Sequence, residues 1–100
     1  MAKISYARQA IVDLERISDF LAGQDAAAPL EVMDLIDEAI AVLARHPLIG
    51  REAEAGLHAL IISHGRTAYI ALYSFQPDQD AILILAIRHQ REAGFRSRAS

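Results

Sequence analysis

The stretch TAYIALYSFQPDQDAILILAI, residues 67–87, predicts a β-hairpin. Its arms, residues 67–75 and 81–87, are rich in Ile, Leu, Tyr and Phe, and the Pro- and Asp-containing segment between them is typical of a turn. A third run of the same character, LHALIIS at residues 57–63, comes before it, and the short segment HGR separates the two. The three runs therefore indicate an antiparallel β-meander.

The run at residues 81–87 is apolar at successive positions, which predicts that both faces of this strand are covered. A single layer of helices covers only one face of a sheet. The other face is expected to meet a second subunit, a partner chain or the protein's own C-terminal segment, because large exposed apolar patches are uncommon on monomers.

Two helices are predicted upstream of the meander. The first extends from about residue 8 to residue 22, and its apolar residues recur at the spacing of an amphipathic helix. Those residues are Ile11, Leu14, Ile17 and Leu21. We expect Gly23 to end this helix in the left-handed conformation.

The second helix is expected to begin between Asp25, a possible N-cap, and Pro29, and to end before Pro47. Its apolar residues cover more than one face, which indicates packing against both the first helix and the sheet. Ile36 and Ile40 lie one turn apart on the face expected to point at the sheet.

These elements predict an α+β fold, in which a two-helix antiparallel hairpin packs on one face of a three- to four-stranded antiparallel sheet. KISY, residues 3–6, supplies a possible short opening strand. One hundred residues fit one domain, and we expect residues 1–100 to form it.

Several classes of protein are not supported by the composition. The chain has no cysteine, so it has neither a disulfide framework nor a thiolate metal site. No apolar run approaches the roughly 20 residues that span a bilayer, and the N-terminus lacks a signal-peptide core, so we expect a cytoplasmic protein without membrane contact. His58 and His64 are about 20 Å apart along one strand, too far to share a metal ion. We expect no metal and no cofactor.

The charge is distributed unevenly along the chain. The net charge is -3, but residues 88–100 carry four arginines and one glutamate, whereas residues 1–87 carry 12 acidic and 6 basic side chains. Between residues 13 and 38, eight carboxylates accompany a single arginine. Such a region repels nucleic acid and can attract a basic partner, although a run of charges is usually a solvated helix face.

Acid-base and cationic side chains gather where the last strand ends. If the hairpin turns near Asp78, Arg88 is expected to lie beside Tyr69, and the strand end returns to the HGR turn. The residues brought together in this way are His64, Arg66, Tyr69, Arg88, His89 and Arg91. Imidazole and guanidinium groups suit phosphodiester cleavage, and they equally suit docking on an acidic surface. The third interpretation is that strand ends simply carry polar residues.

Four segments give the chain a family resemblance. HPLIGR at residues 46–51, GLHALI at residues 56–61, YIALYSF at residues 69–75 and ILAIRHQREAGF at residues 84–95 follow the predicted helices in order. This arrangement, over nearly the whole chain, resembles the RelE/ParE family of bacterial toxins from type II toxin-antitoxin modules. The resemblance implies a toxin, encoded on a chromosome or plasmid, that a cognate ParD-like antitoxin holds inactive.

The resemblance implies one of two targets. RelE-like members are ribosome-dependent endoribonucleases that cut mRNA, and that chemistry would be assigned here to Arg66, Arg88 and His89. ParE-like members bind DNA gyrase and have no known catalytic centre. Two departures weigh against the nuclease: Phe95 stands where many relatives have a tyrosine, and His58 stands where relatives commonly have an arginine.

We therefore expect a ParE-like gyrase inhibitor that acts by protein-protein binding, without catalytic residues and without sequence-specific contacts to nucleic acid. A pI of about 5.7 also fits poorly with entry into a site lined by rRNA. The residues expected to bind the target are Arg88, His89, Arg91, Phe95, Arg96 and Arg98. The ribonuclease and a degenerate toxin that binds only the antitoxin are the alternatives.

Overall fold

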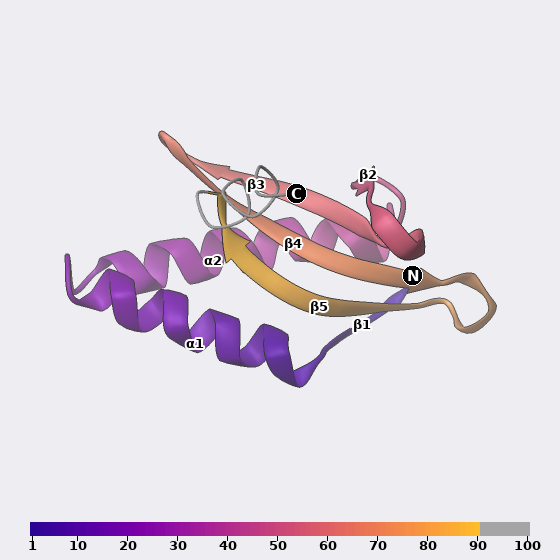
Figure 1. Ribbon diagram of the computed structural model, residues 1–100, viewed down its shortest axis with the longest axis horizontal. Helices are drawn as coiled ribbons and strands as arrows, with labels where there is room; N and C mark the ends of the chain where they lie inside the picture. Colours follow the sequence, from indigo (N-terminus) through magenta and orange to yellow (C-terminus); the bar gives the residue numbers. More distant parts are fainter. Residues whose placement is uncertain (91–100) are drawn as a thin grey trace.

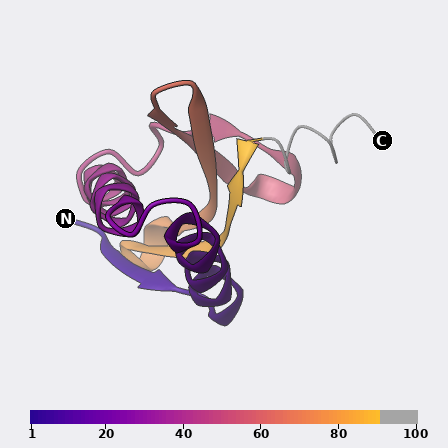
Figure 2. The same cartoon turned by 90° about the vertical axis from the view of Figure 1, so that its left-hand side faces the viewer.

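The computed structural model describes residues 1–90, in which two helices cover one face of a five-stranded sheet (Figure 1). The elements in chain order are β1 (Lys3–Tyr6), α1 (Arg8–Ala22), α2 (Ala28–Ala41), the 3-10 turn η1 (Val42–Ala44), β2 (Arg51–Glu52), η2 (Glu54–Gly56), β3 (His58–His64), β4 (Thr67–Gln76), η3 (Pro77–Gln79) and β5 (Ala81–His89). Both helices lie on the same side of the sheet when the molecule is turned (Figure 2). None of the helices in residues 1–90 is long and apolar enough to cross a membrane.

The strand order is β1-β5-β4-β3-β2, and β1 runs parallel to β5 whereas all other neighbours are antiparallel. The α+β class and the helical hairpin are confirmed, but the prediction of a three- to four-stranded antiparallel sheet is wrong. The direction of β1 relative to β5 is set by the path of the chain between the two strands. A four-residue segment carries no signal of that path. The two-residue strand β2 is too short to give a period-two pattern.

The central hairpin forms as predicted but with a different register at its end. Tyr73 pairs with Ile84 and Leu72 pairs with Ala86, so Leu85 is an extra residue on β5. Beyond this β-bulge, Arg88 lies opposite Ile70 and His89 lies opposite Tyr69. The prediction that Arg88 lies beside Tyr69 is therefore wrong by one residue, because His89 takes that place. Arg88 and His89 each lie on the face of the sheet opposite to the one expected.

The helices begin and end close to their predicted limits. α1 has the expected bounds, but Gly23 is not left-handed: its φ is -70°, and its N–H reaches the carbonyls of Asp19 and Leu21. The chain thus leaves α1 in a right-handed turn that needs no glycine. α2 begins inside the expected range, with Pro29 in its first turn and the Asp25 carboxylate accepting the Ala27 N–H at 3.0 Å.

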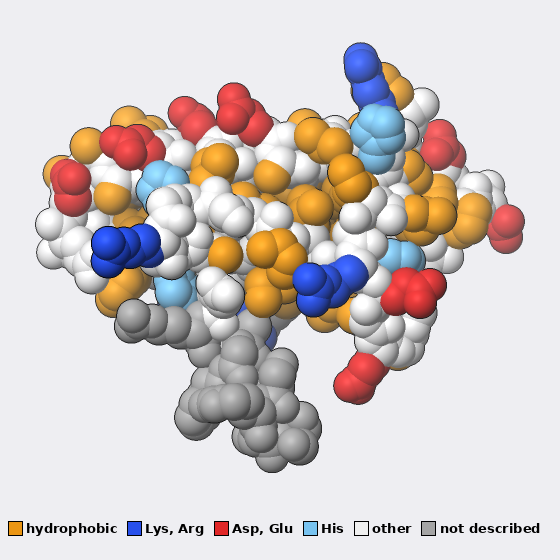
Figure 3. Space-filling view, turned by 90° about the horizontal axis from the view of Figure 1, so that it is seen from above, with side chains coloured by type: hydrophobic (Ala, Val, Ile, Leu, Met, Phe, Trp, Pro, Cys, Tyr) orange, Lys and Arg blue, Asp and Glu red, His pale blue; other side chains and the backbone are white. Residues whose placement is uncertain are grey.

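The core lies between the helices and the sheet, and Ile36 and Ile40 are buried in it as predicted. Within residues 1–90 the opposite face of the sheet has no helix on it, and Ile61 and Leu83 are exposed. Seen from above, apolar side chains form a group in the middle of the molecule, with basic side chains to either side (Figure 3). That a second chain or segment covers this face of the sheet stays a prediction.

Candidate functional site

The candidate site is built around the buried carboxylate of Asp13, a residue of α1 that binds to the edge of β5. β1 pairs with β5 only as far as Tyr6, opposite Ile84, so the edge beyond that point needs another partner. α1 supplies it, because the Asp13 carboxylate accepts the N–H of Ile87 at 2.9 Å. Asp13 is fully buried, and its side chain continues the ladder where the strand stops.

Arg88, Gln9 and Arg16 also surround this carboxylate. The Arg88 Nη1 atom lies 2.9 Å from Asp13 Oδ1, and the Gln9 side-chain amide donates to the same oxygen at 2.8 Å. Arg16 Nη2 lies 3.7 Å from it. A buried carboxylate is tolerated only with such compensation, so the Arg88 guanidinium, whose side chain is 30% exposed, neutralises a charge of the protein itself.

A groove of about 490 Å³ lies next to this ion pair, between the second half of α1 and the ends of β4 and β5. Its lining residues are Arg16, Ile17, Phe20, Gln24, Thr67, Tyr69 and His89. The His89 ring meets the Tyr69 ring edge to face, with centroids 5.4 Å apart. Burial raises the pKa of the Tyr69 phenol above its usual 10.0, so this group remains protonated near neutral pH.

The other predicted site residues are only partly brought together. The β3–β4 turn does return to the end of β5, as expected, because Tyr69 pairs with His89. Arg66 is exposed in this turn, next to Gly65, whose φ of 60° suits a two-residue hairpin turn. Arg91, Phe95, Arg96 and Arg98 lie outside the described residues, as does any contact that they make.

Among residues 1–90, no group of three or more His, Asp or Glu side chains is arranged to hold a metal ion. His58 and His64 stand at opposite ends of β3. The His58 ring stacks on Tyr73 with centroids 5.5 Å apart, so it packs as a strand residue.

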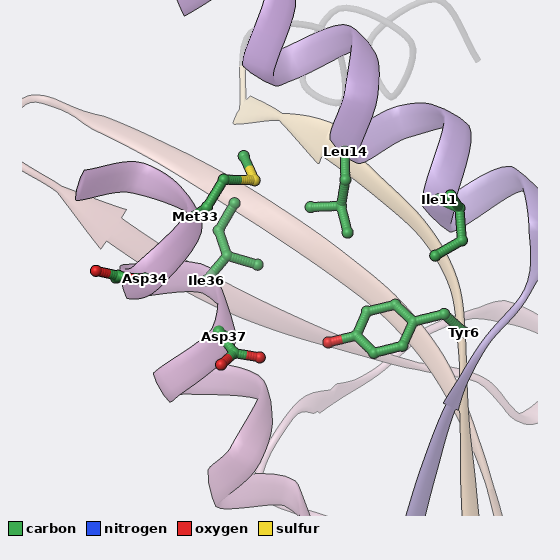
Figure 4. A pocket seen from close by; sticks show the side chains of 7 residues that line it. All are labelled: Tyr6, Ile11, Leu14, Met33, Asp34, Ile36 and Asp37. Carbon is green, nitrogen blue, oxygen red and sulfur yellow. The ribbon is translucent and has the colours of Figure 1, made fainter. Parts of the chain in front are cut away.

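A second groove, of about 370 Å³, lies between the two helices and is lined by residues of β1, α1 and α2 (Figure 4). Ile11, Leu14 and Met33 make its walls apolar, and Asp34 and Asp37 make one side acidic. The Tyr6 hydroxyl points across the groove toward Asp37 in Figure 4. Burial, and then the charge of Asp37, raise the pKa of Tyr6.

Residues 4–94 match the family described as the ParE toxin of the type II toxin-antitoxin system, parDE. The chain belongs to this family. Toxin RelE3 of Caulobacter vibrioides is 29% identical over 92 residues, which are 92% of this chain and 98% of that protein. Among solved structures, one from the chromosomal ParDE system of P. aeruginosa has a TM-score of 0.75 at 24% identity, covering 89% of this chain and 96% of its own. The RelBE2 complex from Mycobacterium tuberculosis contains a chain with a TM-score of 0.59 at 22% identity, covering 89% and 98%.

Sequence reasoning missed Asp13, the residue of this ParE-family toxin around which the site is built. A signal was present, because Asp13 falls between Ala10 and Ile17 at helical spacing, on the buried face of α1. A lone carboxylate on such a face needs a partner that lies elsewhere in the chain.

Proposed function

We propose that this ParE-family toxin inhibits DNA gyrase by binding it, without catalysing a reaction of its own. The observation that carries the proposal is the ion pair between Arg88 and Asp13, 2.9 Å long. A nuclease would require Arg88 to neutralise a phosphate, and withdrawing it would remove the closest cation from a buried carboxylate, at a cost of several kcal/mol. Of the expected catalytic residues Arg66, Arg88 and His89, Arg88 is therefore occupied by Asp13 and does not serve a phosphate.

The remaining surface suits binding. Arg and aromatic residues are common anchors of protein interfaces, and this end of the sheet presents Arg66, the exposed ring of Phe20 and the His89–Tyr69 pair around one groove and its adjoining turn. The basic stretch from Arg88 to Arg98 continues from it in the sequence. We assign target binding to His89, Arg91, Phe95, Arg96 and Arg98. Arg88 was expected to bind the target as well, but its ion pair with Asp13 gives it the role of positioning the strand end before these residues.

Ribosome-dependent cleavage of mRNA is the second candidate, and one feature favours it. His89 lies against Tyr69 in a groove that also contains Arg16, so an imidazole, a phenol and a guanidinium line one cavity. The relative named Toxin RelE3 also points in this direction. The phenol of Tyr69 is held above its usual pKa, however, which makes it a poor base at neutral pH.

A cognate ParD-like antitoxin would neutralise the toxin by covering the groove between α1 and α2. The apolar walls of this groove and its acidic side at Asp34 and Asp37 fit an amphipathic helix with basic flanking residues. Two of the structurally similar chains come from toxin-antitoxin systems, which supports a cognate antitoxin as the partner. Adding the product of the neighbouring antitoxin gene should raise the melting temperature of the toxin, and no rise would contradict this part of the proposal.

Two assays on the purified toxin separate the targets. In the first, gyrase supercoils relaxed plasmid in the presence of increasing toxin; in the second, ribosomes programmed with mRNA are incubated with the same toxin. We expect inhibition of supercoiling and intact mRNA. Codon-specific cleavage of ribosome-bound mRNA that is lost in a well-folded His89→Ala would establish the second candidate instead.

A further inference from the structure

The loop between η1 and β2 carries two large apolar side chains in solvent. Leu48 is 62% exposed and Ile49 is 57% exposed. Their neighbours in the loop, Arg45 and His46, are exposed as well, and so is Arg51 at the start of β2. Residues 45–51 contain no acidic side chain, although the chain as a whole is acidic.

This loop is held in one conformation by the core beneath it. The Tyr73 side chain is fully buried, and its hydroxyl donates to the carbonyl of Pro47 at 2.8 Å and accepts the N–H of Gly50 at 3.0 Å. The Ile49 N–H closes the turn by donating to the His46 carbonyl at 3.1 Å.

Gly50 allows the loop to approach the sheet this closely. A Cβ atom at this position would lie 2.8 Å from the Ala59 carbonyl oxygen and 2.8 Å from the Tyr73 hydroxyl. The backbone of the loop is therefore fixed on both sides of its tip, and the exposure of Leu48 and Ile49 is a property of the folded protein.

Two exposed aliphatic side chains on a turn whose backbone is fixed are suited to binding. Their exposure to water is unfavourable by itself, and a loop that only connects two elements could be polar. Because the backbone is already ordered, burying these side chains in a partner costs little conformational entropy.

The charge of the loop indicates the kind of partner. The antitoxin helix is proposed to carry basic flanking residues, which this basic loop repels, so the loop suits a different partner. The flanking cations Arg45 and Arg51 favour a partner surface whose rim carries carboxylates.

We propose that residues 45–51 form a docking knob that buries Leu48 and Ile49 against an apolar, carboxylate-rimmed surface of the folded protein that the toxin inhibits. The inference rests on the proposed function, because it assigns this surface to the target and not to the antitoxin. It adds to the C-terminal contact residues a second anchor, which is positioned by Tyr73.

The test compares the double variant Leu48→Ser, Ile49→Ser with the wild-type toxin. Leu30→Ser is the matched control, since Leu30 is 73% exposed at the other end of α2. We expect the double variant to inhibit gyrase supercoiling at least about tenfold more weakly, and the control to inhibit it within about twofold of wild type. The melting temperature should stay within about 2 °C and the antitoxin affinity within about twofold in both variants.

Full inhibition by the double variant would overturn the inference, and so would a selective loss of antitoxin affinity, which would assign the knob to the antitoxin. If the wild-type toxin does not inhibit gyrase, the proposed function fails separately. The knob is then judged by growth inhibition in cells without antitoxin, where the double variant must be less toxic than Leu30→Ser at equal expression. Equal toxicity of the two variants would overturn it.

Discussion

Asp13 and Arg88 are separated by 75 positions in the sequence, yet their side chains meet at 2.9 Å and fasten α1 to the end of the last described strand. The carboxylate does so by serving two partners of the same strand, the N–H of Ile87 and the guanidinium of Arg88. The position of the end of β5 thus depends on a residue of the first helix.

Removing this carboxylate should destabilise the toxin. Asp13→Ala leaves the N–H of Ile87 without its acceptor and Arg88 without its anion, and we expect a loss of about 3 kcal/mol in the free energy of unfolding. Urea unfolding measures it, with Asp19→Ala on the exposed side of α1 as the control. A double-mutant cycle with Arg88→Ala should give a coupling of about 1 kcal/mol or more. Additive effects of the two changes would contradict the described ion pair.

Ile40 tests the packing of α2 on the sheet. Ile40→Ala removes a side chain that is almost completely buried, and we expect a loss of about 2 to 5 kcal/mol. Val42→Ala, two residues further along and exposed, should cost less than about 1 kcal/mol. An unchanged unfolding midpoint in Ile40→Ala would mean that this face of the helix is not in the core.

The hydroxyl of Tyr73 should stabilise the loop at residues 45–51. Tyr73→Phe keeps the buried ring but leaves the Pro47 carbonyl and the Gly50 N–H without their partner, which should cost about 1 to 3 kcal/mol. Hydrogen exchange at Gly50 should accelerate more than exchange in the centre of β4. Tyr6→Phe, in the open groove between the helices, serves as the control. Uniform acceleration over the whole sheet would show that the hydroxyl does not act locally.

The three tyrosines predict how stability changes in alkali. Burial raises the pKa values of Tyr6, Tyr69 and Tyr73 above 10.0 in the folded protein, so the unfolded chain releases these protons first. Their contribution is fully present below pH 10 and is lost as the pH rises through the folded-state pKa values. The free energy of unfolding should therefore fall above about pH 10, and Tyr69→Phe should fall less steeply than wild type. Phenolate absorbance provides an independent titration; ordinary pKa values in the native protein would contradict the prediction.

The parts of the fold that depend on local pattern could be predicted from the sequence, and those that depend on distant neighbours could not. The spacing of Ile36 and Ile40 identified the buried face of α2 directly. The extra residue Leu85 cannot be recognised in a run that is apolar at every position. The β-bulge was therefore not predicted, and Arg88 and His89 were assigned to the wrong faces of the sheet. Asp13 was grouped with the solvated acidic residues, because its role follows from where β1 stops pairing with β5.

The basic C-terminal stretch should be more important for toxicity than any single side chain before it. A binding surface distributes its energy over several anchors, and residues 91–100 contain Arg91, Phe95, Arg96 and Arg98. Deleting residues 91–100 should therefore abolish growth inhibition, whereas His89→Ala should reduce it only moderately. A catalytic site would behave in the opposite way, since loss of its acid or base commonly costs about two to four orders of magnitude in rate. Growth curves after induction without antitoxin, with expression and antitoxin binding measured for each variant, distinguish these outcomes. Complete loss of toxicity in a well-folded His89→Ala would favour the ribonuclease.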